Sequence, residues 1–350
     1  MKDADYAPIG PNSAAGASDQ HFDTVLYEGT HSSGPQRIGG LNFQPDLVWI
    51  KTRNQAQNHV IFDSLRGNDH LLAPTTTAVE AVDPNSLTSF NPDGFSLGVD
   101  TGVNYNAKHH VAWCWKAGNG SVEDTSGDIA VTRSTNVEAG FSIISYTQGS
   151  TATGTTIAHG LGKRPDFFIH KSRNQAYNWD VWHTDLVDTA ERLKLNSADD
   201  SENLASTDWN PTATTIATGG SPHHAATDQI VYVWTSIEGF SKFGSYYGNN
   251  DTDGAFVYLG FKPALLIIKG RDNDARQWTM YSNKIMPYNG TDGPINFADA
   301  STVEDSSGNH HLDFLSNGFK VRNVHDHEGN AETYIYMAWA EMPFKYATGR

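Results

Sequence analysis

The stretch LNFQPDLVWIKTRN at residues 41–54 decides the fold, because closely similar stretches return twice later in the chain. They read LGKRPDFFIHKSRN at 161–174 and LGFKPALLIIKGRD at 259–272. In each copy a proline is followed six residues later by lysine and eight residues later by arginine. The prolines lie 120 and 98 residues apart, which predicts a unit of about one hundred residues present in three copies. The three sets are Pro45, Lys51 and Arg53; Pro165, Lys171 and Arg173; and Pro263, Lys269 and Arg271.

The same landmarks flank all three copies. Upstream, an aromatic segment leads into a glycine, as FDTVLYEG from Phe22, FSIISYTQG from Phe141 and FSKFGSYYG from Phe240. Downstream, each copy has a short aromatic segment and a closing apolar run, which reads VAWCW, VYVWT or YMAWA. Because the order of these landmarks is the same each time, the similarity indicates a repeat of a whole domain-sized unit. The aromatic residues of the short segment are Phe62, Trp182 and Tyr281.

The local pattern of each unit is typical of β-strands. A proline cannot donate to a ladder and so begins a strand, while LVWI, DFFI and LLII are apolar on both alternating faces. Such runs suit strands buried on two sides. The lysine and arginine that follow share one face, and we expect them to mark the point where the strand emerges into solvent. Glycine, Asn and Asp between the runs supply turn residues.

We therefore predict an all-β protein of three tandem β-sandwich repeats, jelly-roll-like, with little helix. Short helices are expected only near 77–81 and 188–193. A pseudo-threefold β-prism or barrel, in which the copies share one core, is the competing architecture. The second unit departs from the pattern, because NPTATTIATGG replaces the Asn-Gly or Asp-Gly turn, so a hairpin there is expected to be altered or lost.

The repeat sets the expected boundaries. Residues 1–20 form an N-terminal docking arm with too little apolar content to hold itself in place. The units are expected at 21–118, 140–238 and 239–350, with a Gly/Ser/Asp-rich linker at 119–139 that contains one candidate strand, DIAVTRS. The arm is expected to pack either on the protein's own domains or, in preference, on a partner.

Composition narrows the function classes. The net charge of −16 would repel a phosphate backbone, so no nucleic acid is expected as a partner. The only cysteine, Cys114, lies in an apolar run, so packing must supply the stability. No stretch of 18 apolar residues exists, and no membrane insertion or signal peptide is expected.

The units, with EGFSKFGSYYG, FLSNGFKVRN and the final YIYMAWAEMPFKYATGR, resemble a family of repeat-bearing proteins of tailed bacteriophages of marine bacteria. Members of that family are described as tail-fibre or virion structural proteins with a domain of unknown function. The resemblance covers nearly everything after residue 20. It implies a virion component assembled in the host cytoplasm, and it carries over no catalytic residues.

Two sets of residues are candidate binding groups. Trp179 and Trp278, beside the short aromatic segments, would form sugar-stacking platforms if exposed; the alternative is that they are core residues. The basic columns Lys51, Arg53, Lys171, Arg173, Lys269 and Arg271 suit either a polyanion site or ion pairs with acidic loops, each contributing about 1 kcal/mol or less.

Metal and catalytic patterns are weaker. His325 and His327 share one face of a strand, as some metal ligands do, but two ligands are too few. The acidic clusters at 248–254 and 199–203 offer oxygen ligands for Ca²⁺ without matching an EF-hand loop, and ordinary turn chemistry also explains them. No cofactor is expected. Ser96 in GFSLG matches a nucleophile elbow, but its alternating surroundings predict a strand.

The expected function is that of a non-enzymatic virion protein, as capsid decoration, fibre or tail-associated component. It would dock on other virion proteins through residues 1–20 and self-associate, with a trimer as the expected oligomer. A glycan-binding receptor module of a tail fibre is the alternative, and a polysaccharide depolymerase is a more distant one.

Overall fold

The structure is a computed structural model that describes residues 20–150, 154–203, 209–218, 226–273, 275–290, 293–323 and 332–341. Within these ranges the chain is built almost entirely of antiparallel strands, which confirms the all-β prediction. The helices of the described residues include one α-helical turn, α1 (Thr101–Asn104), and one 3-10 turn (His31–Ser33). The predicted docking arm, apart from Gln20, lies outside the described residues.

Three large sheets share one strand order. In each sheet the first strand of the unit pairs with its closing strand, which pairs with the central strand of the Pro-Lys-Arg motif, followed by the short aromatic strand and one more. Sheet I contains β1 (Phe22–Glu28), β9 (His109–Trp115), β3 (Leu47–Thr52), β4 (Val60–Asp63), β5 (Gly67–Leu72) and β6 (Ala81–Val82). Sheet III contains β20 (Ser241–Tyr247), β27 (Thr333–Ala340), β22 (Pro263–Gly270), β23 (Thr279–Ser282) and β24 (Asn296–Phe297).

Sheet II has two additional strands at its first edge. Its common part contains β12 (Phe141–Thr147), β19 (Asp228–Trp234), β14 (Phe167–Ser172), β15 (Asp180–His183), β16 (Glu191–Lys194) and β17 (Glu202–Asn203). The additional strands β10 (Val122–Asp124) and β11 (Val131–Asn136) lie within the stretch expected as a linker, and β11 pairs with β12 in register. The region between the first two units is therefore part of the second sheet.

Each large sheet carries a small sheet on its outer side. The first small sheet contains β2 (Gln36–Gly39), β8 (Gly94–Leu97) and β7 (Leu87–Asn91), and the third contains β21 (Phe256–Tyr258), β26 (Gly318–Val321) and β25 (Leu312–Leu315). Among the described residues the second small sheet has only β13 (Thr156–Ala158) and β18 (Thr215–Ala217). Strand β18 lies within NPTATTIATGG, the sequence that replaces the Asn-Gly or Asp-Gly turn of the other units. Each unit is thus a two-layer sandwich, as predicted.

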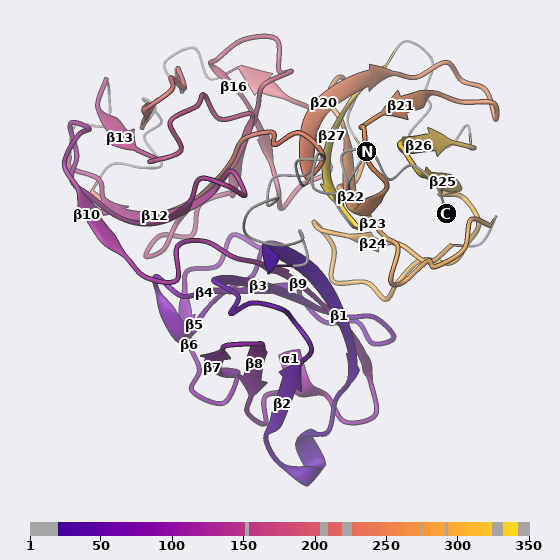
Figure 1. Cartoon of the computed structure of the whole chain (residues 1–350), viewed down its shortest axis with the longest axis horizontal. Coiled ribbons are helices and arrows are strands. Elements are labelled where there is room, and N and C mark those ends of the chain that lie inside the picture. The colour runs from indigo at the N-terminus through magenta and orange to yellow at the C-terminus, as the bar shows by residue number, and fades with distance from the viewer. Residues whose placement is uncertain are drawn as a thin grey trace, which may run out of the picture.

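The three sandwiches are arranged around a centre, so that the inner faces of the large sheets share one hydrophobic core (Figure 1). The indole rings of Trp115, Trp234 and Trp339 meet there, one from each closing strand, with ring centroids 5.4 to 6.1 Å apart and edge-on packing. The structure therefore combines the predicted β-sandwiches with the shared core expected of the competing β-prism or barrel architecture.

The central strands explain why their sequence is apolar on both faces. Every residue of β3, β14 and β22 is buried. In sheet I, Trp49 packs in the shared core while Val48 and Ile50 pack against the first small sheet. A strand between two apolar layers needs hydrophobic residues at every position, and the repeated run provides them.

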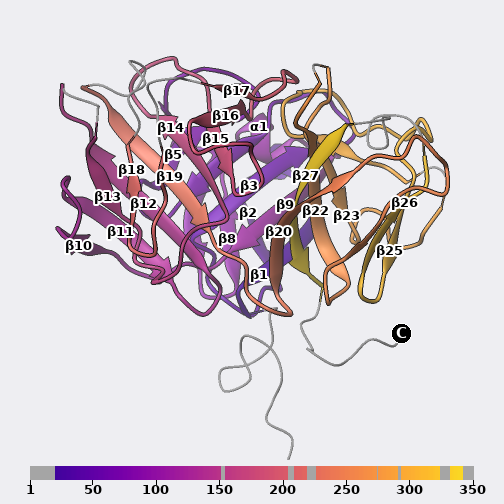
Figure 2. The same ribbon diagram turned by 90° about the horizontal axis from the view of Figure 1, so that it is seen from above.

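The strands run between two opposite ends of the molecule (Figure 2). The tryptophan end is where Trp115, Trp234 and Trp339 lie, and where β1 begins and β27 ends; the ring of Phe22 lies 6.0 Å from that of Trp339. The loop end is the opposite one, where β1 ends opposite His109 and β12 ends opposite Asp228. The first and last strands of the described body therefore meet at one end.

The two expected helices are absent from the described chain, and these predictions were wrong. Residues 77–81 lead into β6, and residues 188–193 lead into β16. The first segment is held extended against the second sheet, because Glu80 N–H donates to the carbonyl of Arg173 at 2.7 Å. No described helix has the length and apolar character needed to cross a membrane.

Candidate functional site

The lysines of the repeated motif are buried, so the prediction that their strands emerge into solvent there is wrong. Lys51 is 1% exposed, and Lys171 and Lys269 are 0% exposed. Each Nζ donates to a backbone carbonyl further along its own unit, at distances of 2.5 to 2.8 Å. These carbonyls belong to Gln57, Tyr177 and Arg276. The sequence shows a charge next to an apolar run, but not the neighbouring sheet that covers it.

Each lysine also reaches a neighbouring sheet. Lys171 donates to the carbonyl of Thr77 at 3.0 Å and thereby links sheet II to sheet I. The equivalent bonds are Lys269 to Ala198 at 2.8 Å and Lys51 to Ser301 at 3.3 Å. The three bonds run from second to first, third to second and first to third sheet, and so close a ring. Because burial disfavours the ammonium form, the pKa values of Lys51 and Lys171 fall to about 8.

The arginines of the motif reinforce the same contacts. Arg173 forms a two-pronged ion pair with Glu80, at 3.0 and 2.8 Å, and Arg53 pairs with Glu304 at 2.7 Å. At the third contact Ser201 takes the place of the acid, and Arg271 instead pairs with its neighbour Asp272. The expectation that these arginines pair with acidic groups is confirmed, and two of the partners come from another sheet.

The tryptophans proposed as sugar platforms are core residues. Trp179 and Trp278 are each 0% exposed, so the interpretation as exposed stacking surfaces is wrong. The indole of Trp179 donates to the carbonyls of Thr76 and Ala73 in the loop between β5 and β6, at 3.0 and 3.2 Å, and that of Trp278 donates to the carbonyl of Lys194 at 2.8 Å. In the first unit the buried His59 stands at this position. These side chains join sheets to one another.

A buried charge network lies between sheets I and II, and sequence reasoning missed it. The guanidinium of Arg66 bonds Asp63 at 2.5 Å and Glu80 at 2.9 Å, and Tyr232 of sheet II donates to Asp63 at 2.7 Å. Burial by itself would lower the pKa of Arg66, but Asp63, Tyr232 and Glu80 together outweigh burial and the pKa is raised. The network fixes how the two sheets meet.

The weaker chemical patterns have local structural roles. Ser96 lies within strand β8, as expected from its alternating surroundings, and its hydroxyl accepts a hydrogen bond from Asn91. In the acidic cluster at 248–254, Asn249 and Asp251 accept backbone N–H bonds two residues on, which is turn chemistry. Across the described ranges, no three His, Cys, Asp or Glu side chains are grouped to hold a metal ion. His325 and His327 lie outside those ranges.

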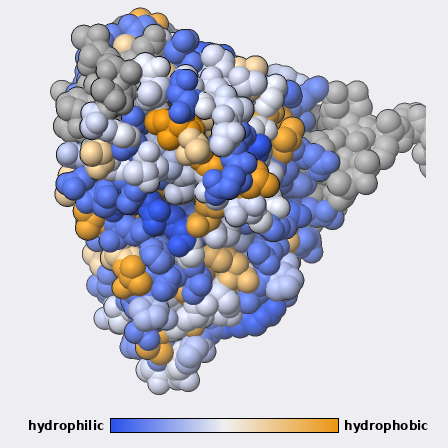
Figure 3. Space-filling model, turned by 90° about the vertical axis from the view of Figure 1, so that its left-hand side faces the viewer, coloured by the Kyte–Doolittle hydropathy of each residue, from blue (hydrophilic) through white to orange (hydrophobic). Residues whose placement is uncertain are grey.

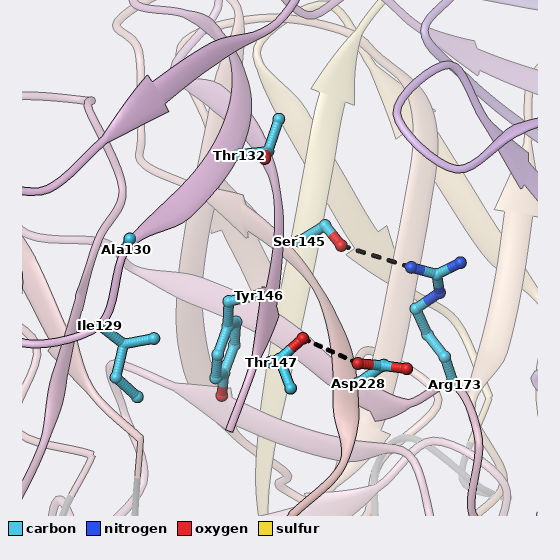
Figure 4. A pocket seen from close by; sticks show the side chains of 8 residues that line it. All are labelled: Ile129, Ala130, Thr132, Ser145, Tyr146, Thr147, Arg173 and Asp228. Atoms are coloured by element: carbon cyan, nitrogen blue, oxygen red, sulfur yellow. Dashed lines mark hydrogen bonds between the residues drawn. The ribbon is translucent and has the colours of Figure 1, made fainter. Parts of the chain in front are cut away.

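An open groove of about 430 Å³ lies at the loop end of sheet II (Figure 4). Its walls come from the strands β11, β12 and β19, the segment before β11 and Arg173 just after β14, and they are brought together because β11 extends the sheet beyond β12. We call it the β11–β12 groove. Its lining residues are Ile129, Ala130, Thr132, Ser145, Tyr146, Thr147, Arg173 and Asp228.

Hydrogen-bonding groups dominate this groove. Thr147 donates to the carboxylate of Asp228 at 2.8 Å, and Arg173 reaches the hydroxyl of Ser145 at 3.5 Å (Figure 4). Tyr146 is buried, and its hydroxyl bonds His170 at 3.0 Å. The surrounding side of the molecule, over β10 and β13, is mostly hydrophilic with scattered apolar residues (Figure 3).

Of the residues predicted from sequence as binding groups, Arg173 alone lines the groove. The remaining lining residues were missed because they are small polar residues at strand ends. One signal was available: the second unit is preceded by 119–139, and no comparable segment separates the second unit from the third. That segment supplies β10, β11 and one wall of the groove.

Comparison with curated proteins gave no match, and comparison with solved structures gave none either. The family model described as a domain of unknown function (DUF7483) matches residues 17–343, a span that includes all three large sheets. Because the match covers most of the chain, the protein belongs to the DUF7483 family.

Proposed function

We propose that the protein is a structural component of a bacteriophage virion, as capsid decoration, fibre or tail-associated protein. The observation that carries the proposal is the closed ring of three sandwiches, whose first and last described strands meet at the tryptophan end. In this proposal the end where β1 begins and β27 ends faces the particle, and the loop end faces outward. The sequence resemblance to tail-fibre and virion structural proteins agrees with such a role.

The ring suits a load-bearing part because its contacts are distributed. Each pair of large sheets is joined by a buried lysine of the motif in addition to the shared core, and two of the three pairs also have an arginine–glutamate ion pair. Opening any one contact would expose apolar surface and leave buried polar groups unpaired, which is costly. The net charge of −16 favours solubility of the free subunit before assembly.

Deletion of residues 1–20 tests the docking part of the proposal. The truncated protein should fold with an unchanged thermal unfolding transition, and its copy number in purified virions should fall at least about tenfold. A variant in which residues 1–20 are kept in composition but scrambled in order is the matched control. Normal incorporation of the truncated protein would contradict docking through this segment. Self-association, with a trimer expected, is part of the proposal and is measured by light scattering.

Receptor recognition is the second candidate function, and the β11–β12 groove favours it. The groove lies at the loop end, opposite the end where the first and last strands meet. A host-cell pulldown at about 0.1 mM protein registers weak single-site contacts. Retention of the protein on susceptible cells supports this function, and equal retention on resistant cells counts against it.

A further inference from the structure

The β11–β12 groove differs from the equivalent places in the other two units. In sheets I and III the strands β1 and β20 are the outermost strands of the described sheets, so no wall like that of β11 stands beside them. In sheet II, Thr132 of β11 lies directly opposite Ser145 of β12 in the ladder. The cavity is thus a feature added to one unit of the repeat.

The groove presents polar groups suited to hydroxylated ligands. Each oxygen of the Asp228 carboxylate accepts one hydrogen bond from within the protein, from Thr147 at 2.8 Å and from the side chain of Asn174 at 3.2 Å. A carboxylate has about four acceptor positions, so two remain for a ligand. The hydroxyls of Thr132 and Ser145 both donate and accept.

The charge of the groove selects against anions. The guanidinium of Arg173 is already neutralised by the two-pronged pair with Glu80. None of the ion pairs formed among the described residues includes Asp228, so its negative charge is not compensated there. A carboxylated or phosphorylated ligand would be repelled at this position, whereas a neutral hydroxyl group is a good donor to the carboxylate.

The size and shape of the groove fit one or two sugar rings. Its volume of about 430 Å³ falls within the range of about 300 to 1,000 Å³ that small-molecule sites occupy. Ile129 and Ala130 give one side of it an apolar surface. A pyranose has an apolar face of C–H groups and a rim of hydroxyls, which matches an apolar wall beside hydrogen-bonding groups.

We propose that the β11–β12 groove binds a neutral saccharide, with Asp228 accepting hydrogen bonds from sugar hydroxyls. Thr132, Ser145 and Thr147 exchange further hydrogen bonds with the ring, and Ile129 contacts its apolar face. The inference gives a ligand class to the receptor-recognition role and in that sense rests on it. It does not depend on how the protein docks on a particle.

Saturation-transfer NMR on the full chain tests the proposal directly. The probes are the neutral disaccharides lactose, maltose and cellobiose, with glucuronic acid and N-acetylneuraminic acid as charged counterparts, each at about 10 mM to detect weak binding. At least one neutral disaccharide should give transfer, and the acids should give less. No transfer from any neutral sugar, or stronger transfer from the acids, would overturn the assignment.

Two variants localise the binding. Asp228→Ala should raise the dissociation constant for the sugar at least about tenfold, because a charge-assisted hydrogen-bond acceptor is lost. Ala130→Trp should block the groove without removing any hydrogen-bonding group, and position 130 is exposed, so folding is not at risk. Asp253→Asn, on an exposed loop of the third unit, is the matched control and should bind like the parent protein.

The outcomes separate this inference from the proposed virion role. Sugar binding that survives both groove variants overturns the assignment of the site. Loss of binding in both variants with normal virion incorporation supports the site independently of docking. Failure of the residue 1–20 deletion experiment affects the docking proposal alone.

Discussion

Arg53 and Glu304 lie 251 residues apart in the chain and meet where the third large sheet closes against the first. The guanidinium Nε lies 2.7 Å from the carboxylate Oε2, and the backbone N–H of Glu304 donates to the carbonyl of Arg53 at 2.8 Å. The same backbone bond joins Glu80 to Arg173 and Ser201 to Arg271. The three sheets are therefore joined in a closed cycle with one recurring contact.

A double-mutant cycle on this pair measures the strength of the closure. Because both side chains are mostly buried, at 15% and 22% exposure, we expect Arg53→Ala and Glu304→Ala to be coupled by about 1 kcal/mol in the free energy of unfolding. Urea denaturation of the two single variants and the double variant gives the value. The exposed pair of Arg37 and Asp93 is the control and should show little coupling. Additive effects of Arg53→Ala and Glu304→Ala would show that the pair does not help to close the ring.

The buried network at the first contact is expected to be much more sensitive. Asp63→Asn leaves the buried guanidinium of Arg66 without its closest charge partner and should reduce the free energy of unfolding by about 3 to 5 kcal/mol. Tyr232→Phe removes one neutral donor and should cost about 1 kcal/mol. Denaturant titration of both variants measures the two losses in the free energy of unfolding, and the loss for Asp63→Asn should be the larger. An Asp63→Asn protein as stable as the parent would show that the network contributes nothing net.

The tryptophan trio should behave as one packed core. Trp339→Ala would leave a cavity where three aromatic rings meet and should destabilise the protein by about 3 to 5 kcal/mol. Tyr288→Ala removes a ring that is 84% exposed and serves as the control, with little change expected. Thermal unfolding followed by fluorescence measures both. Equal effects of the two substitutions would contradict a shared centre.

The buried carboxyl of Asp299 should make the stability of the fold depend on pH. Burial raises the pKa of its carboxyl from 3.8 to about 6, so the folded protein holds the proton more tightly than the unfolded chain. Its contribution to stability is therefore present below pH 3.8 and is lost as the pH rises through 6. The backbone N–H of Trp278 donates a hydrogen bond to the Asp299 carboxyl at 3.1 Å, and the amide oxygen of an asparagine at position 299 can still accept it.

Asp299→Asn should consequently gain stability relative to the parent between pH 4 and pH 7, by on the order of 1 to 2 kcal/mol. The measurement is urea unfolding of the two proteins at closely spaced pH values. A difference that does not change with pH would show that this carboxyl titrates normally.

The repeat and its strands were predictable because burial on two sides leaves a clear trace in sequence. The strands that contain Trp49, Phe168 and Leu266 begin with apolar residues, are buried at every position and form the centres of the three sheets. The Asp-Gly sequence before Phe95 and the Asn-Gly sequence before Phe319 each join two antiparallel strands, β7 to β8 and β25 to β26. Gly94 and Gly318 each begin a strand at a point where a Cβ would clash with a carbonyl of the neighbouring strand, that of Ile38 or Val257.

The contacts between units were not predictable from one sequence. An apolar pattern shows that a residue is buried but not which element covers it, so Trp179 and Trp278 were compatible with either core or surface. Lys51 was misread for the same reason, because its carbonyl acceptor on Ser301 comes from another unit. The groove depends on Asp228, Ser145 and Thr132, which are separated in sequence and meet only through strand pairing.

Differential scanning calorimetry of the full chain tests the central claim, that the three sandwiches form one body around a shared core. The account predicts a single transition whose calorimetric and van't Hoff enthalpies agree, since no sandwich can open without exposing the common centre. Two or three separable transitions, each with the enthalpy of about one third of the chain, would contradict it and show that the sandwiches are independent domains.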